Sequence, residues 1–136
     1  MSRKYKFLNK EGLYFVSFAT VYWIDVFIRP IYNQIIIESL TYCQKNLGME
    51  LYCWCIMPSH IHLIYSAKNN NPEIILGRFK EYTAKQLIAT ITSNIQESRR
   101  DWMLWMLNAQ LQKAVMLNRI NFGSIIISLL NFGVQR

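Results

Sequence analysis

The sequence lacks the features that mark membrane and secreted proteins. No run approaches the roughly eighteen uninterrupted apolar residues of a membrane helix, and residues 1–6 lead into no apolar signal segment. Cysteines number only three, and Cys53 and Cys55 alternate along an apolar run, where Cys-x-Cys could bind a metal but fits buried, reduced strand thiols better. We therefore expect a cytoplasmic protein without disulfides.

Acidic residues are also scarce. The 136 residues include 8 acidic and 15 basic ones, which gives a formal net charge of +7. This surplus favours a polyanionic partner, either nucleic acid or an acidic membrane surface, without naming it. With 52% hydrophobic residues, the chain is long enough for one domain with a real core and too short for two of ordinary size.

Five segments carry the patterning of regular structure. They are a strand over 13–23, a helix over 31–47, strands over 49–57 and 60–66, and a helix over 73–91. Pro30 suits the first turn of a helix, Gly48 suits the position after its end, and Pro72 ends the polar turn before the second helix. The order β-α-β-β-α opens a ferredoxin-like or RRM-like α+β fold, in which a last strand completes an antiparallel sheet with both helices on one face.

That last strand is not clear from the sequence. A polar stretch over 96–101 and an apolar one over 102–106 lead into a tail of different character. Residues 125–130 have strand propensity and could pair with the free edge of the sheet.

His60 and His62 are the only histidines in the chain. On a strand, side chains two residues apart share a face and lie about 6 to 7 Å apart, so two imidazoles can meet on one cation while Ile61 points into the core. His-x-His alone is a weak signal, because such pairs also occur as surface or hydrogen-bonded histidines without metal.

The surrounding residues, Met57-Pro-Ser-His-Ile-His-Leu-Ile, resemble the HUH motif of single-tyrosine transposases of insertion sequences, including REP-associated tyrosine transposases. The likeness extends to Tyr14-Phe-Val-Ser-Phe-Ala-Thr and to Phe79-Lys-Glu-Tyr-Thr-Ala-Lys, and it covers residues 1–106. It implies a DNA transposition domain over 1–106 that binds single-stranded or hairpin DNA.

The resemblance also implies a chemistry. In that family two histidines, here His60 and His62, and one further polar side chain hold Mg²⁺ or Mn²⁺ over the scissile phosphate, where the cation acts as a Lewis acid. A tyrosine hydroxyl then attacks, which leaves a 5′-phosphotyrosine link and a free 3′-OH. The family places the third metal ligand near that tyrosine.

The nucleophilic tyrosine is missing from this chain. The family's segment resembling Tyr-Ile-His-x-Asn-Pro-Val is absent, and the last tyrosine is Tyr82, which fits base stacking or packing better than catalysis. We therefore predict no catalytic nucleophile and a loss of strand cleavage.

A single-base deletion near Leu107 would explain the missing segment. With suitable synonymous codons, a shifted frame beginning at the third base of Asn121 reads Phe-Trp-Gln-His-His-Asn-Lys-Pro-Ile-Glu, and the family has such a string before its tyrosine. On this hypothesis residues 107–136 are an out-of-frame tail. The alternative is a naturally divergent C-terminus.

Basic and aromatic residues supply candidate DNA contacts. On the second helix they are Arg78, Lys80, Tyr82 and Lys85, and a basic leader adds Arg3, Lys4, Lys6 and Lys10. For any single residue a solvated surface is an equally good interpretation.

Two other functions stay open. One is an active transposase that uses Tyr82 or a tyrosine from another subunit, for which a homodimer would serve. The other is an RRM-like nucleic-acid binder without metal.

Overall fold

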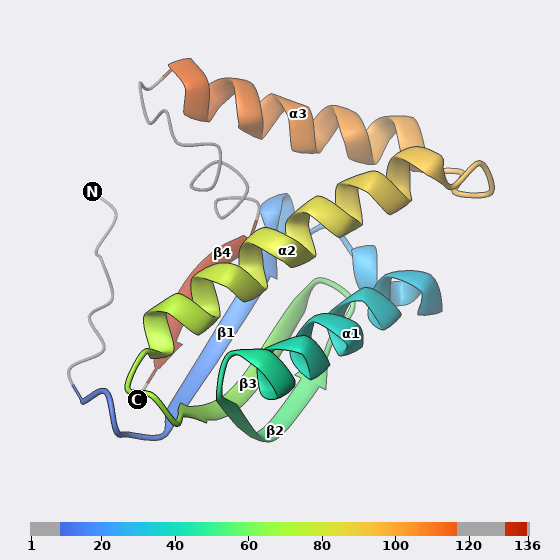
Figure 1. Cartoon of the computed structure of the whole chain (residues 1–136). Coiled ribbons are helices and arrows are strands. Elements are labelled where there is room, and N and C mark those ends of the chain that lie inside the picture. Colours follow the sequence, from blue (N-terminus) through green and yellow to red (C-terminus); the bar gives the residue numbers. More distant parts are fainter. Residues whose placement is uncertain (1–8, 117–129, 136) are drawn as a thin grey trace.

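The computed structural model describes residues 9–116 and 130–135 (Figure 1). In chain order the elements are β1 (Tyr14–Thr20), the 3-10 turns η1 (Val21–Trp23) and η2 (Val26–Ile28), α1 (Pro30–Asn46), β2 (Met49–Ile56), β3 (His60–Ala67), α2 (Pro72–Ser93), α3 (Arg100–Met116) and β4 (Leu130–Gln135). Among these residues no helix is both long and apolar enough to cross a membrane.

The four strands form one sheet in the order β2-β3-β1-β4, and each neighbouring pair is antiparallel. Helices α1 and α2 lie over one face of this sheet, and α3 lies beside α2, on the side away from α1 (Figure 1). The predicted ferredoxin-like α+β arrangement, with both helices on one face, is confirmed. The last strand, which was not clear from the sequence, is β4, and it pairs with the free edge of β1.

The helix ends lie where the sequence predicted them. Pro30 and Pro72 stand in the first turns of α1 and α2, where a missing N–H costs no hydrogen bond. Gly48 follows α1 with a φ of 73°, and a Cβ there would lie 3.1 Å from Nδ2 of Asn69. Glycine is therefore the residue that allows the chain to turn directly from α1 into β2.

The core lies between the helices and the sheet. Alternate residues of β1 and β3 are fully buried there, because successive strand side chains point to opposite faces. The largest buried side chains include Phe18, Ile61, Leu63, Tyr65, Ile36, Phe79 and Ile91. The remaining residues of β1 and β3 form the other face, which we call the imidazole face and define by Phe15, Ser17, His60, His62 and Ile64.

Three features differ from the sequence predictions. The first strand ends at Thr20 instead of extending to residue 23, because η1 turns the chain. Helix α3 was not predicted, and it runs across the proposed boundary between residues 106 and 107. Of the expected tail strand over 125–130, only Leu130 lies within the described residues.

The expected burial of the strand thiols is wrong. Cys53 and Cys55 are both exposed, and Cys55 lies directly opposite His62 on the imidazole face. β2 is an edge strand, and no described helix covers this side of it (Figure 1). Apolar sequence alone could not reveal which face of the strand would be covered.

Candidate functional site

His60 and His62 point to the same face of β3, as their spacing predicted. Their ring centroids lie 4.8 Å apart with the planes at 83° to each other. Ile61 between them is completely buried in the core on the other side. Both imidazoles are half-buried at the middle of the sheet, next to β1.

Aromatic rings hold each imidazole in place. Phe15 of β1 stacks against His62, with ring centroids 5.5 Å apart and nearly parallel planes. Trp23 meets the His60 ring edge-on at 5.6 Å. Ser59 adds a weak contact of 3.4 Å from its Oγ to Nδ1 of His60. Such fixed rings lose little freedom when they bind a ligand.

The donor set fits a metal ion, although only in part. Nδ1 of His62 is buried and has no hydrogen-bond partner among the described residues. A buried nitrogen without a partner is costly, and a bound cation would satisfy it. Within residues 9–116 and 130–135, no third His, Cys, Asp or Glu joins the pair to complete a cluster. The described chain therefore supplies two ligands.

Backbone hydrogen bonds fix the turn that precedes His60. The N–H of Met57 donates to the carbonyl of His60 at 2.8 Å, which closes the hairpin between β2 and β3. The carbonyls of Pro58 and Ser59 accept from Phe27 and Thr20, each at 2.9 Å. The start of β3 is thereby tied to the segment that follows β1.

That segment contains two aromatic residues in the left-handed conformation. Tyr22 and Trp23 have φ values of 54° and 55°, and both side chains are exposed. For residues with a Cβ this conformation costs about 1–2 kcal/mol each. Buried Val21 and Ile24 flank the pair, and the Thr20 hydroxyl donates to the Ile24 carbonyl at 2.6 Å. The aromatic, β-branched composition predicted a strand here and gave no sign of the turn.

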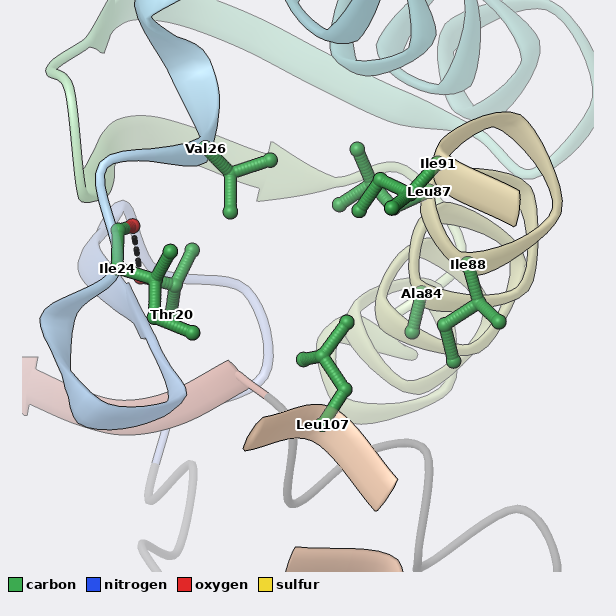
Figure 2. A pocket seen from close by; sticks show the side chains of 8 residues that line it. All are labelled: Thr20, Ile24, Val26, Ala84, Leu87, Ile88, Ile91 and Leu107. Carbon is green, nitrogen blue, oxygen red and sulfur yellow. Dashed lines mark hydrogen bonds between the residues drawn. The ribbon is translucent and has the colours of Figure 1, made fainter. Parts of the chain in front are cut away.

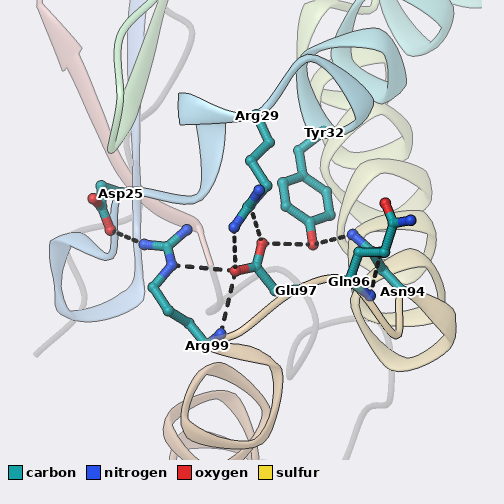
Figure 3. A network of polar contacts seen from close by, with 7 residues as sticks. All are labelled: Asp25, Arg29, Tyr32, Asn94, Gln96, Glu97 and Arg99. Carbon is teal, nitrogen blue, oxygen red and sulfur yellow. Dashed lines mark hydrogen bonds and ion pairs between the residues drawn. The ribbon is translucent and has the colours of Figure 1, made fainter.

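A buried carboxylate connects the same segment to the linker between α2 and α3 (Figure 3). Glu97 is fully buried, pairs with Arg29 at 2.6 Å and accepts a hydrogen bond from the Tyr32 hydroxyl at 3.1 Å. Arg99 contacts Glu97 and also pairs with Asp25 at 2.5 Å. Burial alone would raise the pKa of Glu97, but the hydrogen bonds from Arg29, Arg99 and Tyr32 outweigh it and hold the pKa below its ordinary value.

The four expected DNA contacts on α2 do not lie together. Arg78, Tyr82 and Lys85 are exposed, whereas Lys80 is buried beside the Phe18 ring, 5.5 Å from its centroid. Burial lowers the pKa of Lys80 to about 8. Lys80 is thus part of the helix-to-sheet packing, because residues two apart on a helix point in nearly opposite directions.

The three exposed residues lie away from the histidines. Tyr82 stacks on Tyr42 of α1, with ring centroids 6.4 Å apart, and Lys85 pairs with Glu81 at 2.7 Å. Tyr82 belongs to α2, which covers the face of the sheet opposite the imidazole face (Figure 1). Of the leader residues, only Lys10 lies within the described part of the chain.

An apolar pocket lies where α3 approaches α2 and the segment after β1 (Figure 2). Its lining residues are Thr20, Ile24, Val26, Ala84, Leu87, Ile88, Ile91 and Leu107. The Thr20 hydroxyl is already engaged with the Ile24 carbonyl, so the walls offer little to a polar ligand. Leu107 is the residue of α3 that closes this pocket.

The fold and the site define the class of protein: a ferredoxin-like sheet with a His-x-His pair on the face opposite its helices. The family described as "Transposase IS200 like" matches residues 12–107. This match covers most of the chain, and the protein therefore belongs to the IS200-like transposase family. The predicted family is confirmed.

Solved structures agree on the fold. One is a transposase from Deinococcus radiodurans R1, with 18% identity and a TM-score of 0.51 over 68% of this chain and 72% of that one. Another is a REP-associated tyrosine transposase bound to a REP hairpin, with 15% identity and a TM-score of 0.55 over 63% of this chain. The present chain spans about half of that second protein, 53%. No curated protein is similar enough to count as a match.

Proposed function

We propose that this chain is a transposase-family domain that binds single-stranded or hairpin DNA and holds Mg²⁺ or Mn²⁺ on His60 and His62, without a nucleophile of its own. The family supports DNA transposition as the process. The observation that carries the metal site is the pair of fixed imidazoles 4.8 Å apart, with the buried Nδ1 of His62 left without a partner among the described residues.

The chain's own residues would prepare the site for a phosphate. His60 and His62 present ring nitrogens, and Phe15 prevents the His62 ring from turning away. The net charge of +7 attracts the DNA backbone through counterion release. When bound, the cation supplies Lewis-acid stabilisation of charge on the phosphoryl oxygens. The third ligand would come from outside the described residues or from a second subunit.

Cleavage would fail because the family's downstream tyrosine is missing and Tyr82 does not suit the task. Tyr82 is the last tyrosine in the sequence, and it belongs to α2, which covers the face of the sheet opposite the imidazole face. Its ring also stacks on Tyr42, which gives it an ordinary packing role. We therefore propose that strand cleavage is lost unless a partner subunit contributes a tyrosine.

We also propose that the residues after Leu107 are read out of frame. The family match ends at residue 107, which supports this proposal. The coding DNA tests the idea directly: stop codons or unrelated residues in the shifted frame after Met106 would refute it.

Metal binding is tested by thermal unfolding of the whole chain with and without Mn²⁺. A ligand at a hundred times its Kd stabilises a protein by about 2.7 kcal/mol, so the wild type should melt several degrees higher with Mn²⁺. His60→Ala and His62→Ala should lose this shift, while Gln34→Ala, an exposed change on α1, should keep it. Equal shifts in all four proteins would remove the metal site and favour the metal-free RRM-like binder.

DNA chemistry is tested with a hairpin oligonucleotide in Mn²⁺. Retarded migration that is reversed by denaturant is expected, because the proposal includes binding without covalent capture. A denaturant-resistant adduct would contradict the loss of cleavage. In that case Tyr82→Phe distinguishes a nucleophile in this chain from one that lies elsewhere.

A further inference from the structure

Trp23 is the most unusual side chain near the histidines. Its ring is 63% exposed, yet it lies 5.6 Å from the His60 ring, at the edge of the imidazole face. Exposing a large apolar ring is unfavourable. Holding it on a left-handed backbone, with φ of 55°, adds a second cost. Such costs persist where the surrounding structure enforces them, and they are concentrated at functional sites.

The turn that carries Trp23 is rigid. Its two ends, Val21 and Ile24, are buried, and Ile24 donates its N–H to the Val21 carbonyl at 3.3 Å. Thr20 donates through its hydroxyl to the carbonyls of Ile24 and Ser59 and through its N–H to the Ser59 carbonyl. Asp25 next in sequence is held by Arg99. The backbone that carries the Trp23 ring is therefore held in place before any ligand arrives.

We infer that Trp23 stacks on an unpaired base of the DNA strand whose phosphate lies at His60 and His62. This inference rests on the proposed function, and it assigns a base-binding subsite to that site. Every base has an aromatic face, so stacking needs no particular sequence. The 5.6 Å between the rings compares with about 3.4 Å per nucleotide along one strand of a duplex. A neighbouring base can therefore reach Trp23 from a phosphate at the histidines.

The test compares two probes that differ only in their bases: fluorescein-labelled dT12 and an abasic 12-mer with the same sugar-phosphate chain. Fluorescence anisotropy in Mn²⁺ gives the affinity ratio of the two for each protein. The variants are Trp23→Gly, Trp23→Phe and, as the matched control, Trp105→Ala. Trp105 is 64% exposed on α3, so its loss removes an equally exposed ring elsewhere.

In the wild type, dT12 should bind more tightly than the abasic chain. Trp23→Gly should lower the affinity ratio about 5- to 150-fold, which corresponds to the loss of one stacked base. Trp23→Phe should restore most of the ratio, and Trp105→Ala should leave it unchanged. An unchanged ratio in Trp23→Gly, or an equal fall in Trp105→Ala, would overturn the inference.

Two controls separate stacking from a purely structural role of Trp23. Glycine accepts the left-handed conformation, so Trp23→Gly should melt at or above the wild-type temperature. Because Trp23 also contacts the His60 ring, each ratio is measured at a Mn²⁺ concentration that saturates that variant, and a fall in Mn²⁺ affinity with an unchanged ratio would make Trp23 only a support for the His60 ring. If the wild type binds neither probe, the proposed function fails as well; if it binds dT12 and only the Trp23 ratio is unchanged, the inference fails alone.

Discussion

The two faces of the sheet differ in how closely their side chains are packed. On the helical face, Phe18 and Ile61 are completely buried and packed against α1 and α2. On the imidazole face, the neighbouring residues of the same strands leave rings half-exposed and one histidine nitrogen without a partner among the described residues. Because side chains alternate along a strand, one strand can stabilise the fold on one side and carry a site on the other.

The largest expected loss of stability comes from a comparison of one residue on each face. Phe18 and Phe15 lie on the same strand and point to opposite sides. Phe18→Ala should cost about 3–5 kcal/mol of unfolding free energy, because it leaves a cavity in the core. Phe15→Ala should cost only about 1 kcal/mol, since its ring is half-buried against His62.

Urea denaturation of the two variants and the wild type measures both values. The difference in cost is the informative quantity, because both changes remove the same ring. Equal losses would show that the imidazole face is packed as tightly as the core, contrary to the structure.

A second prediction concerns Glu97, which joins the segment beside the imidazole face to the helical layer. The pKa of Glu97 is lowered in the folded protein, so its stabilisation is present above its unfolded pKa and is lost as the pH falls through the folded value, below 4.5. Glu97→Gln should cost about 2 kcal/mol at pH 7, because ionic hydrogen bonds from Arg29 and Arg99 are lost.

Thermal unfolding between pH 3 and pH 7 gives the comparison. The wild type should lose stability toward acid more steeply than Glu97→Gln. Parallel curves would mean that Glu97 does not anchor the segment. Glu38→Gln, on the exposed surface of α1, is a suitable control.

The third prediction concerns Lys80, the cation enclosed by the helical face. The pKa of Lys80 falls from an ordinary 10.5 to about 8. Between these values the unfolded chain binds more protons than the folded one, so stability should rise with pH, by about 2 kcal/mol from pH 7.5 to 10.

Lys80→Met should remove this rise and should be no less stable at pH 7.5, because it fills the same space without a charge. Lys85→Met, on the exposed side of α2, should keep the wild-type pH dependence. If the stability of the wild type did not change between pH 7.5 and pH 10, the Lys80 ammonium would lie in solvent.

The sequence predicted the parts of the fold that depend on local rules. The prolines at the starts of α1 and α2 and the glycine after α1 set helix ends to within two residues. Alternation along β3 predicted that His60 and His62 share a face, since that spacing needs only an extended backbone.

The sequence did not predict features that depend on distant residues. The left-handed turn at Tyr22 and Trp23 is held by hydrogen bonds from Thr20 to Ile24 and Ser59, and a strand-like composition conceals it. Lys80 looked like a surface cation in a basic cluster. It is buried because α2 packs on the sheet with the Lys80 side of the helix facing the core. Glu97 gave no signal at all, because two of its partners, Arg29 and Tyr32, lie 68 and 65 residues before it in the chain.

By itself, the sequence determined the element order, the pair of histidines on one strand and the absence of any tyrosine beyond Tyr82. These properties need only chain order and the two-residue period of a strand. Tertiary structure decided which face stays open, which cation is buried, and that Trp23 comes to lie beside His60. Such facts depend on packing between segments far apart in the chain, and local propensity does not encode that packing.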